Sequence, residues 1–70
     1  MFEPGSSVVQ KLYDDPKSRY DIYGVVLSNN GEKIVVALHA DVIRKATFDR
    51  NGVRNDEEAY IEPYIPSLDI

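Results

Sequence analysis

Asp14, Asp15 and Asp21 form a group of carboxylates on one predicted loop of this chain of 70 residues. Grouped carboxylates can bind calcium, which takes about six to eight oxygen ligands from a regularly spaced loop. The Asp-x-Asp-x-Asp-Gly spacing of such a loop is absent. We interpret the three aspartates as part of a solvated loop, and we expect no metal site and no cofactor.

His39 is the single histidine, and the chain has no cysteine. These counts exclude thiolate and multi-histidine metal sites. No serine lies at a recognised spacing from His39, and the chain lacks a nucleophile elbow, a phosphate-binding loop and a dinucleotide-binding fingerprint. We therefore expect no catalytic residue and no enzymatic activity.

Lys17, Arg19 and Tyr20 bring two cations and an aromatic ring together in one predicted loop. Such a combination can hold a phosphate or stack on a nucleic-acid base. The aspartates on both sides of this loop cancel the positive field that would attract a phosphate. A polar loop is the preferred interpretation, with phosphate binding as its alternative.

Five tyrosines are the feature most suggestive of binding. Tyrosine is favoured at interfaces because it buries a large area and keeps a polar tip. Tyr23 is expected in the core, so it is left out of the candidate surface. The candidate interface residues are the other four tyrosines and two valines of a predicted hairpin: Tyr13, Tyr20, Tyr60, Tyr64, Val26 and Val35.

The net charge of −4 is concentrated at the C-terminal end of the chain. Residues 1–48 carry six acids and six bases, whereas residues 49–70 carry six acids and two bases. This acidic balance disfavours tight binding to a nucleic-acid backbone. The acidic end is either a solvated loop or a surface for a basic partner, with candidate residues Asp56, Glu57, Glu58 and Glu62.

Residues 20–28 and 33–39 predict a β-hairpin, because both are rich in β-branched and aromatic residues. Asn30-Gly31 between them favours a type I′ turn, which requires positive φ at both central positions. That turn predicts one face with the pairs Leu27–Ile34, Val25–Val36 and Tyr23–Leu38, which we assign to the core. The opposite face, with Val26 facing Val35 and Gly24 facing Ala37, is covered by another strand or by another molecule.

Further short strands are predicted on both sides of this hairpin, at residues 7–13, 45–48 and 59–63. Asp49-Arg50-Asn51-Gly52 predicts a type I turn followed by a left-handed glycine. Residues 39–46 favour at most a single helical turn. The fold class is mainly β: a small five-stranded antiparallel SH3-like barrel or strongly bent sheet, with a dimerising open sheet as the alternative. Residues 1–70 form a single small β domain, with 62–70 as an irregular C-terminal tail.

The hairpin and turn residues also resemble those of small uncharacterised phage and prophage proteins with a predicted SH3-like barrel. The resemblance rests on Tyr23–Val26, Ile34–Val36 and the turn Thr47–Gly52. It implies a barrel fold and an accessory role in a mobile element, and it carries over no functional residue. Lys11–Asp15 and Ile65-Pro66 resemble motifs of SH3 domains, but the chain has no tryptophan for the aromatic clamp that binds proline helices.

The N-terminal residues 1–5 have no basic region, and no apolar run is long enough for a membrane span, so we expect a cytoplasmic protein. The preferred function is a non-catalytic protein-binding accessory module of phage or prophage type, whose partner is another protein or a second copy. The first alternative is a nucleic-acid-binding small barrel that uses Lys17, Arg19, Lys33, Arg44 and Lys45. The second is an acidic DNA mimic that inhibits a nucleic-acid-binding protein through Asp49, Asp56, Glu57, Glu58 and Glu62.

Overall fold

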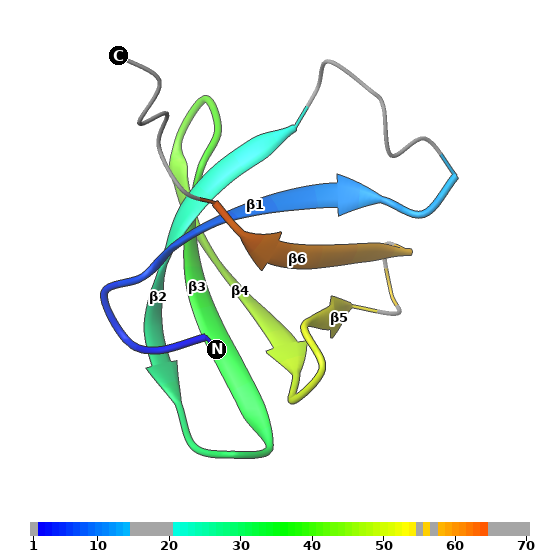
Figure 1. Ribbon diagram of the computed structural model, residues 1–70. Coiled ribbons are helices and arrows are strands. Elements are labelled where there is room, and N and C mark those ends of the chain that lie inside the picture. The colour runs from blue at the N-terminus through cyan, green and yellow to red at the C-terminus, as the bar shows by residue number, and fades with distance from the viewer. Residues whose placement is uncertain (1, 15–20, 55, 57, 65–70) are drawn as a thin grey trace, which may run out of the picture.

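The computed structural model describes residues 2–14, 21–54, 56 and 58–64, which form one antiparallel sheet that is nearly closed into a barrel (Figure 1). The strand order is β4-β3-β2-β1-β6-β5, and contacts between β4 and β5 bring the two ends of the sheet together. The strands are β1 (Ser7–Leu12), β2 (Ile22–Asn29), β3 (Lys33–His39), β4 (Ile43–Asp49), β5 (Val53–Arg54) and β6 (Ala59–Pro63). The small, mainly β fold is confirmed and is compatible with an SH3-like barrel. The described residues contain six strands instead of the predicted five, because Val53–Arg54 pairs with β6.

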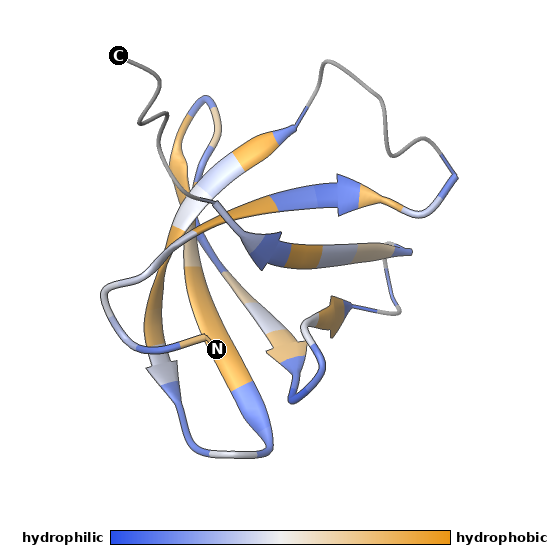
Figure 2. Cartoon of the chain, viewed as in Figure 1, coloured by the Kyte–Doolittle hydropathy of each residue, from blue (hydrophilic) through white to orange (hydrophobic). Residues whose placement is uncertain are grey.

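Alternating side chains of the strands fill the interior of this barrel. In β3, Ile34, Val36 and Leu38 are buried while Val35 and Ala37 between them are half-buried, as a pleated strand with one core face requires. Figure 2 shows hydrophobic residues along β2 and β3 and hydrophilic residues in the turn that joins them. The core cluster is completed by residues from the N-terminus and the other long strands: Phe2, Val8, Val26, Ala46, Phe48 and Ile61.

The predicted register of the β2–β3 hairpin is wrong, by two residues next to the turn and by one residue beyond the β-bulge. Val26 pairs with Val36 and Gly24 with Leu38, and a β-bulge follows between Val26 and Ser28. As a result Val26 is 1% exposed, whereas Tyr23 and Leu27, which we assigned to the core, lie on the outer face and are about half exposed. The core assignment for β3 is confirmed, and the assignment for β2 is reversed.

The turn of the same hairpin explains this shift. Only Gly31 has positive φ, at +90°, so Asn30 does not adopt the conformation that a type I′ turn requires. The Asn30 side-chain oxygen instead accepts hydrogen bonds from the backbone N–H groups of Glu32 and Lys33, at 2.9 and 2.8 Å. Because the asparagine side chain supplies the acceptor, the bend moves to Gly31-Glu32.

The turn at Asp49–Gly52 forms as predicted and also closes the barrel. The Gly52 N–H donates to the Asp49 carbonyl at 2.9 Å, and Gly52 has a left-handed φ of +82°. The Asp49 carboxylate accepts from the backbone N–H groups of Asn51 and Val53, at 2.8 and 3.0 Å. The Gly52 carbonyl accepts from the Ile61 N–H at 2.8 Å, so the turn between β4 and β5 is tied to β6.

Two further sequence predictions are corrected by the strand bounds. Residues 40–42 form a bend, and β4 begins at Ile43, so the helical turn considered for residues 39–46 is absent. Strand β6 has the predicted bounds, so Glu62 and Pro63 belong to a strand instead of the irregular tail assigned to 62–70. Pro63 lies at the end of β6, beyond its pairing with β5, where a proline is tolerated. The part of the predicted tail at residues 65–70 lies outside the described residues. The described residues also contain no helix that is long and apolar enough to cross a membrane.

Candidate functional site

Two pairs of tyrosines lie on the outer face of the barrel, and we call these four residues the tyrosine surface. In the first pair, the Tyr13 and Tyr60 rings are 4.9 Å apart and tilted by 39°. Tyr60 points outward because its neighbour Ile61 points into the core, and Tyr13 follows directly after β1. The Tyr13 N–H donates to the Glu58 carbonyl at 3.0 Å, so β1 and the segment before β6 hold the pair together.

The second pair, Tyr23 and Tyr64, joins β2 to the residue after β6. The ring centroids are 4.9 Å apart in an edge-to-face arrangement at 61°, a favourable aromatic geometry. Tyr64 is anchored by its N–H, which donates to the Ser7 carbonyl at 2.9 Å. Tyr23 is 48% exposed and Tyr64 is 39% exposed, so both rings keep area that a partner can bury.

The charge at the tyrosine surface is set by Lys11, whose register partner is Tyr60. The Lys11 ammonium is 2.9 Å from the Asp21 carboxylate. This hydrogen bond, together with the negative charges of Asp21 and Glu62, raises the pKa of Lys11 above its usual value of 10.5, against a smaller lowering by desolvation. Lys11 therefore stays cationic at neutral pH, and its charge is neutralised locally by Asp21.

The structure separates the predicted acidic surface into two parts. Glu58 and Glu62 are exposed, and they lie two residues before and two residues after Tyr60. Asp56 forms an ion pair instead, with its carboxylate 3.0 Å from Nε of Arg54. Glu57 lies outside the described residues. Of the predicted acidic group, Glu58 and Glu62 thus adjoin the tyrosine surface.

The other candidate interface residues do not join this surface as predicted. Val26 is wrong as an interface residue, since the register of β2 places it in the core. Val35 is half-buried on the outer face of β3, opposite Thr47 and Ser28. Tyr20 lies outside the described residues. The same register error placed Tyr23 in the predicted core, whereas it lies on the outer face.

The cations considered for nucleic-acid binding lie at separate places on the described chain. Arg44 pairs with the buried Leu38 and so points to the inner face, whereas its neighbour Lys45 points to the outer face. Lys33 is at the other end of the β3–β4 pair, opposite Asp49. Lys17 and Arg19 lie outside the described residues.

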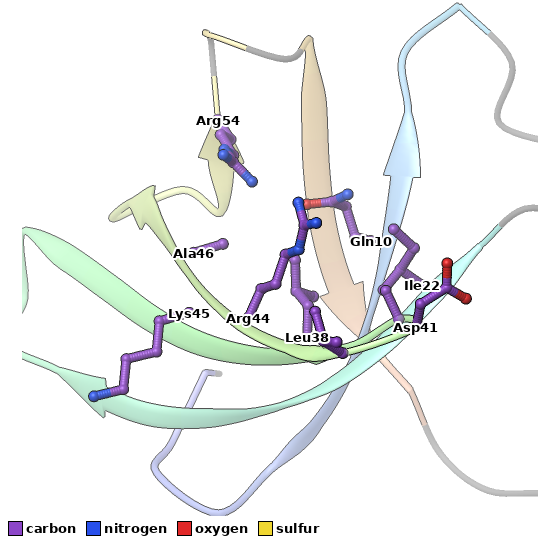
Figure 3. Close-up of a pocket in the computed structure, with 10 residues that line it drawn as sticks. Gln10, Ile22, Leu38, Asp41, Arg44, Lys45, Ala46 and Arg54 are labelled. Atoms are coloured by element: carbon purple, nitrogen blue, oxygen red, sulfur yellow. The ribbon is translucent and has the colours of Figure 1, made fainter.

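A pocket of about 170 Å³ opens at one end of the barrel, and we call it the barrel-mouth pocket (Figure 3). Its lining includes one residue from each of the first five strands: Gln10, Ile22, Leu38, Arg44 and Arg54. Neither Gln10 nor Arg54 was among the functional residues predicted from the sequence. A signal was present, because Gln10 is a polar residue at the inward position between Val8 and Leu12 in the alternation of β1.

Two regions of the described chain thus combine accessible surface with distinctive chemistry: the tyrosine surface on the outer face and the barrel-mouth pocket on the inner face. A scan of protein-family models, a search of curated proteins and a search of solved structures find no match to this chain. Function is therefore inferred from the chemistry of these two regions.

Proposed function

We propose that this protein is a non-catalytic binding module whose tyrosine surface docks a basic segment of another protein. The observation that carries the proposal is the presence of two ring-contacting tyrosine pairs, Tyr13–Tyr60 and Tyr23–Tyr64, on the outer face of a small barrel. Three of these rings are exposed and Tyr60 is half-buried. Tyrosine rings supply contact area at a low cost in conformational entropy, because only two side-chain torsions are ordered. Their hydroxyl groups add hydrogen bonds at the rim of an interface.

Charge selects the partner. Lys11 lies beside Tyr60, and its charge is neutralised by Asp21. Glu58 and Glu62, which also lie beside Tyr60, are exposed. An arginine or lysine of a partner can stack on a tyrosine ring and pair with one of these carboxylates. The net charge of −4 also speeds the encounter with a basic segment.

We further propose an accessory role in the cytoplasm of a cell that carries a phage or prophage. This part rests on the resemblance of the hairpin and of the Thr47–Gly52 turn to small phage and prophage proteins. The absence of a helix that could cross a membrane in the described chain is compatible with that location.

Selection from a random peptide display library against the intact protein tests the choice of partner. The selected peptides are expected to be enriched in arginine or lysine beside apolar residues. Tyr23→Ser and Tyr60→Ser should each weaken the binding of a selected peptide about tenfold or more, as loss of an interface tyrosine typically does. Leu27→Ser is the matched control, since Leu27 is an exposed apolar residue on the same strand as Tyr23 but lies in the β-bulge and contacts neither tyrosine pair.

Three outcomes would contradict this proposal. The first is a set of selected peptides without cationic enrichment, and the second is an equal loss of binding in Leu27→Ser. The third is a concentration-dependent dimer in sedimentation equilibrium that Tyr23→Ser dissociates, because a second copy would then occupy the surface.

A further inference from the structure

The barrel-mouth pocket is built by residues that five strands place on the inner face. Gln10 of β1 is the register partner of Ile22 in β2, and Leu38 of β3 is the register partner of Arg44 in β4. Arg54 of β5 pairs with the fully buried Ala59, which places it on the inner face as well. The mouths of small barrels are a usual location for ligand sites, because inward side chains converge there.

Gln10 is the unusual residue of this pocket. It is 5% exposed, and its side-chain oxygen Oε1 is buried with no hydrogen-bond partner among the described residues. Most buried side-chain polar atoms in folded proteins have a partner, so an orphaned carboxamide calls for an explanation. Leucine would fill the same inward position without this defect. A carboxamide aimed into a pocket indicates that the position serves polar recognition.

Arg44 supplies positive charge next to this carboxamide. In Figure 3 the Arg44 side chain extends across the pocket toward Gln10. Lys45 also contributes to the lining, but its side chain extends away from Gln10 and Arg44. Arg44 forms no ion pair with the described residues that line the pocket. A guanidinium offers paired N–H donors that match the two oxygens of a carboxylate.

The remaining charges limit the ligand to one negative charge. Arg54 also lines the pocket, but its Nε is 3.0 Å from the Asp56 carboxylate. Asp41 and Lys45 line the pocket as well, so the three cations Arg44, Lys45 and Arg54 and the two carboxylates Asp41 and Asp56 leave a net charge of +1 at this end of the barrel. These carboxylates would repel a dianionic phosphate, and the net charge of −4 of the whole chain would repel a nucleic-acid backbone. The pocket volume of about 170 Å³ suits a group the size of a side chain.

We propose that the barrel-mouth pocket binds a monoanionic carboxylate between the Arg44 guanidinium and the Gln10 carboxamide. The carboxylate accepts hydrogen bonds from Arg44 and from Nε2 of Gln10. A ligand that also carries an N–H group, such as a peptide, donates it to Oε1 of Gln10, whereas a simple acid such as acetate uses the first two contacts alone. Either a small free acid or an acidic side chain of a peptide carries this chemistry. The site is independent of the tyrosine surface, because Gln10 and Ile22 point inward where Tyr60 and Tyr23 point outward.

Nuclear magnetic resonance titration of the intact protein tests the site, with the Gln10 side-chain amide and the Arg44 Nε–H as reporters. The ligands are sodium acetate, a capped Ala-Glu-Ala peptide, the matched capped Ala-Gln-Ala peptide and inorganic phosphate. Saturable shifts of both reporters are expected with acetate and with the glutamate peptide. If acetate and the glutamate peptide bind with equal affinity, the ligand is a small free acid. If the glutamate peptide binds more tightly than both acetate and the glutamine peptide, the ligand is an acidic side chain of a peptide. Either result supports the carboxylate site.

Substitutions at two adjacent residues provide the control. Arg44→Gln should weaken binding about tenfold or more, as expected for the loss of a charged hydrogen-bond pair. Lys45→Gln removes the same charge from the opposite face and should leave binding unchanged. Arg44→Lys keeps the charge and loses the paired donors, so it should also weaken binding and serves if Arg44→Gln does not fold.

The proposal is overturned if neither carboxylate ligand moves the two reporters saturably. It is also overturned if Lys45→Gln weakens binding as much as Arg44→Gln, because the attraction would then be a general effect of charge. Phosphate binding more tightly than both carboxylate ligands would overturn the assignment of a single negative charge.

Discussion

The two ends of the barrel interior are made by the same strands but differ in chemistry. At one end of the β3–β4 pair, Ile34 lies opposite Phe48, and both are at most 1% exposed. At the other end, Leu38 lies opposite Arg44, and the buried Gln10 has an oxygen without a partner. The apolar end contributes stability through buried area, whereas the mouth gives up some stability and gains polar groups that can recognise a ligand.

This difference fits the size of the chain. A domain of 70 residues has a thin core, so its stability depends on a small number of large buried side chains. Phe48 is the largest of the fully buried side chains. We therefore expect substitutions at the apolar end to have large effects on folding and substitutions at the mouth to act mainly on binding.

The largest effect is expected from Phe48→Ala at the apolar end. Removal of a fully buried phenylalanine costs about 3–5 kcal/mol of unfolding free energy, which is a large fraction of the stability of a small domain. Urea unfolding followed by circular dichroism measures the loss. Thr47→Ala, on the exposed outer face of the same strand, is the control and should change stability by less than about 0.5 kcal/mol. A loss below about 1 kcal/mol for Phe48→Ala would show that the apolar end is not the main source of stability.

A smaller effect is expected from two matched glycine substitutions. Gly52 and Gly31 have positive φ, at +82° and +90°, so alanine strains the backbone at either position by about 1–2 kcal/mol. A Cβ at Gly52 would also lie 3.1 Å from side-chain atoms of Ile61 and Phe2, whereas a Cβ at Gly31 would meet nothing within 4 Å. Gly52→Ala should therefore destabilise the protein more than Gly31→Ala by about 1 kcal/mol in urea unfolding. Equal losses would mean that close packing at the apolar end does not require Gly52.

At the mouth, Gln10→Leu should increase stability. The substitution removes a buried oxygen without a partner and keeps a similar volume, so a gain of about 1 kcal/mol in unfolding free energy is expected. The same variant should lose carboxylate binding in the titration described above. A destabilised Gln10→Leu would show that the carboxamide supports the fold, and the contrast between the two ends would disappear.

The smallest effect is expected from the Lys11–Asp21 ion pair on the outer face. Folding raises the pKa of Lys11, so the contribution of the pair is fully present below the usual lysine pKa of 10.5 and is lost as the pH rises through the higher folded-state pKa. The difference in urea midpoint between the natural protein and Asp21→Asn should therefore shrink only in this alkaline range. A difference that shrinks at neutral pH would contradict the direction of the pKa shift.

Local sequence signals determined most strand positions and one turn. The alternation of Ile34, Val36 and Leu38 predicts the core face of β3, and the spacing of Asp49 and Gly52 predicts the turn after β4. These features depend on residues close in sequence, through side-chain alternation and through hydrogen bonds within four residues. The bounds of β6 could be predicted for the same reason.

The face of β2 could not be read from periodicity, because both faces of this strand carry apolar residues. Val26 on one face and Tyr23, Val25 and Leu27 on the other satisfy a strand pattern equally well. Gly24 decides the matter in the folded protein. A Cβ at this position would lie 2.5 Å from the Ala37 carbonyl oxygen and 3.0 Å from Val36 Cγ1. Only glycine therefore fits at this point of the pairing between β2 and β3. Such a close approach depends on the partner strand and has no local signature.

The sequence by itself determined a small antiparallel β fold with an acidic C-terminal end, because strand propensity, turn chemistry and charge are properties of short segments. Only the tertiary structure decided which tyrosines form pairs and where Gln10, Arg44 and Arg54 meet. The curvature of a nearly closed sheet brings residues from different strands to one mouth, and it sets the inner and outer faces that separate them from the tyrosines. These relations between distant segments arise from strand pairing, which no single segment specifies.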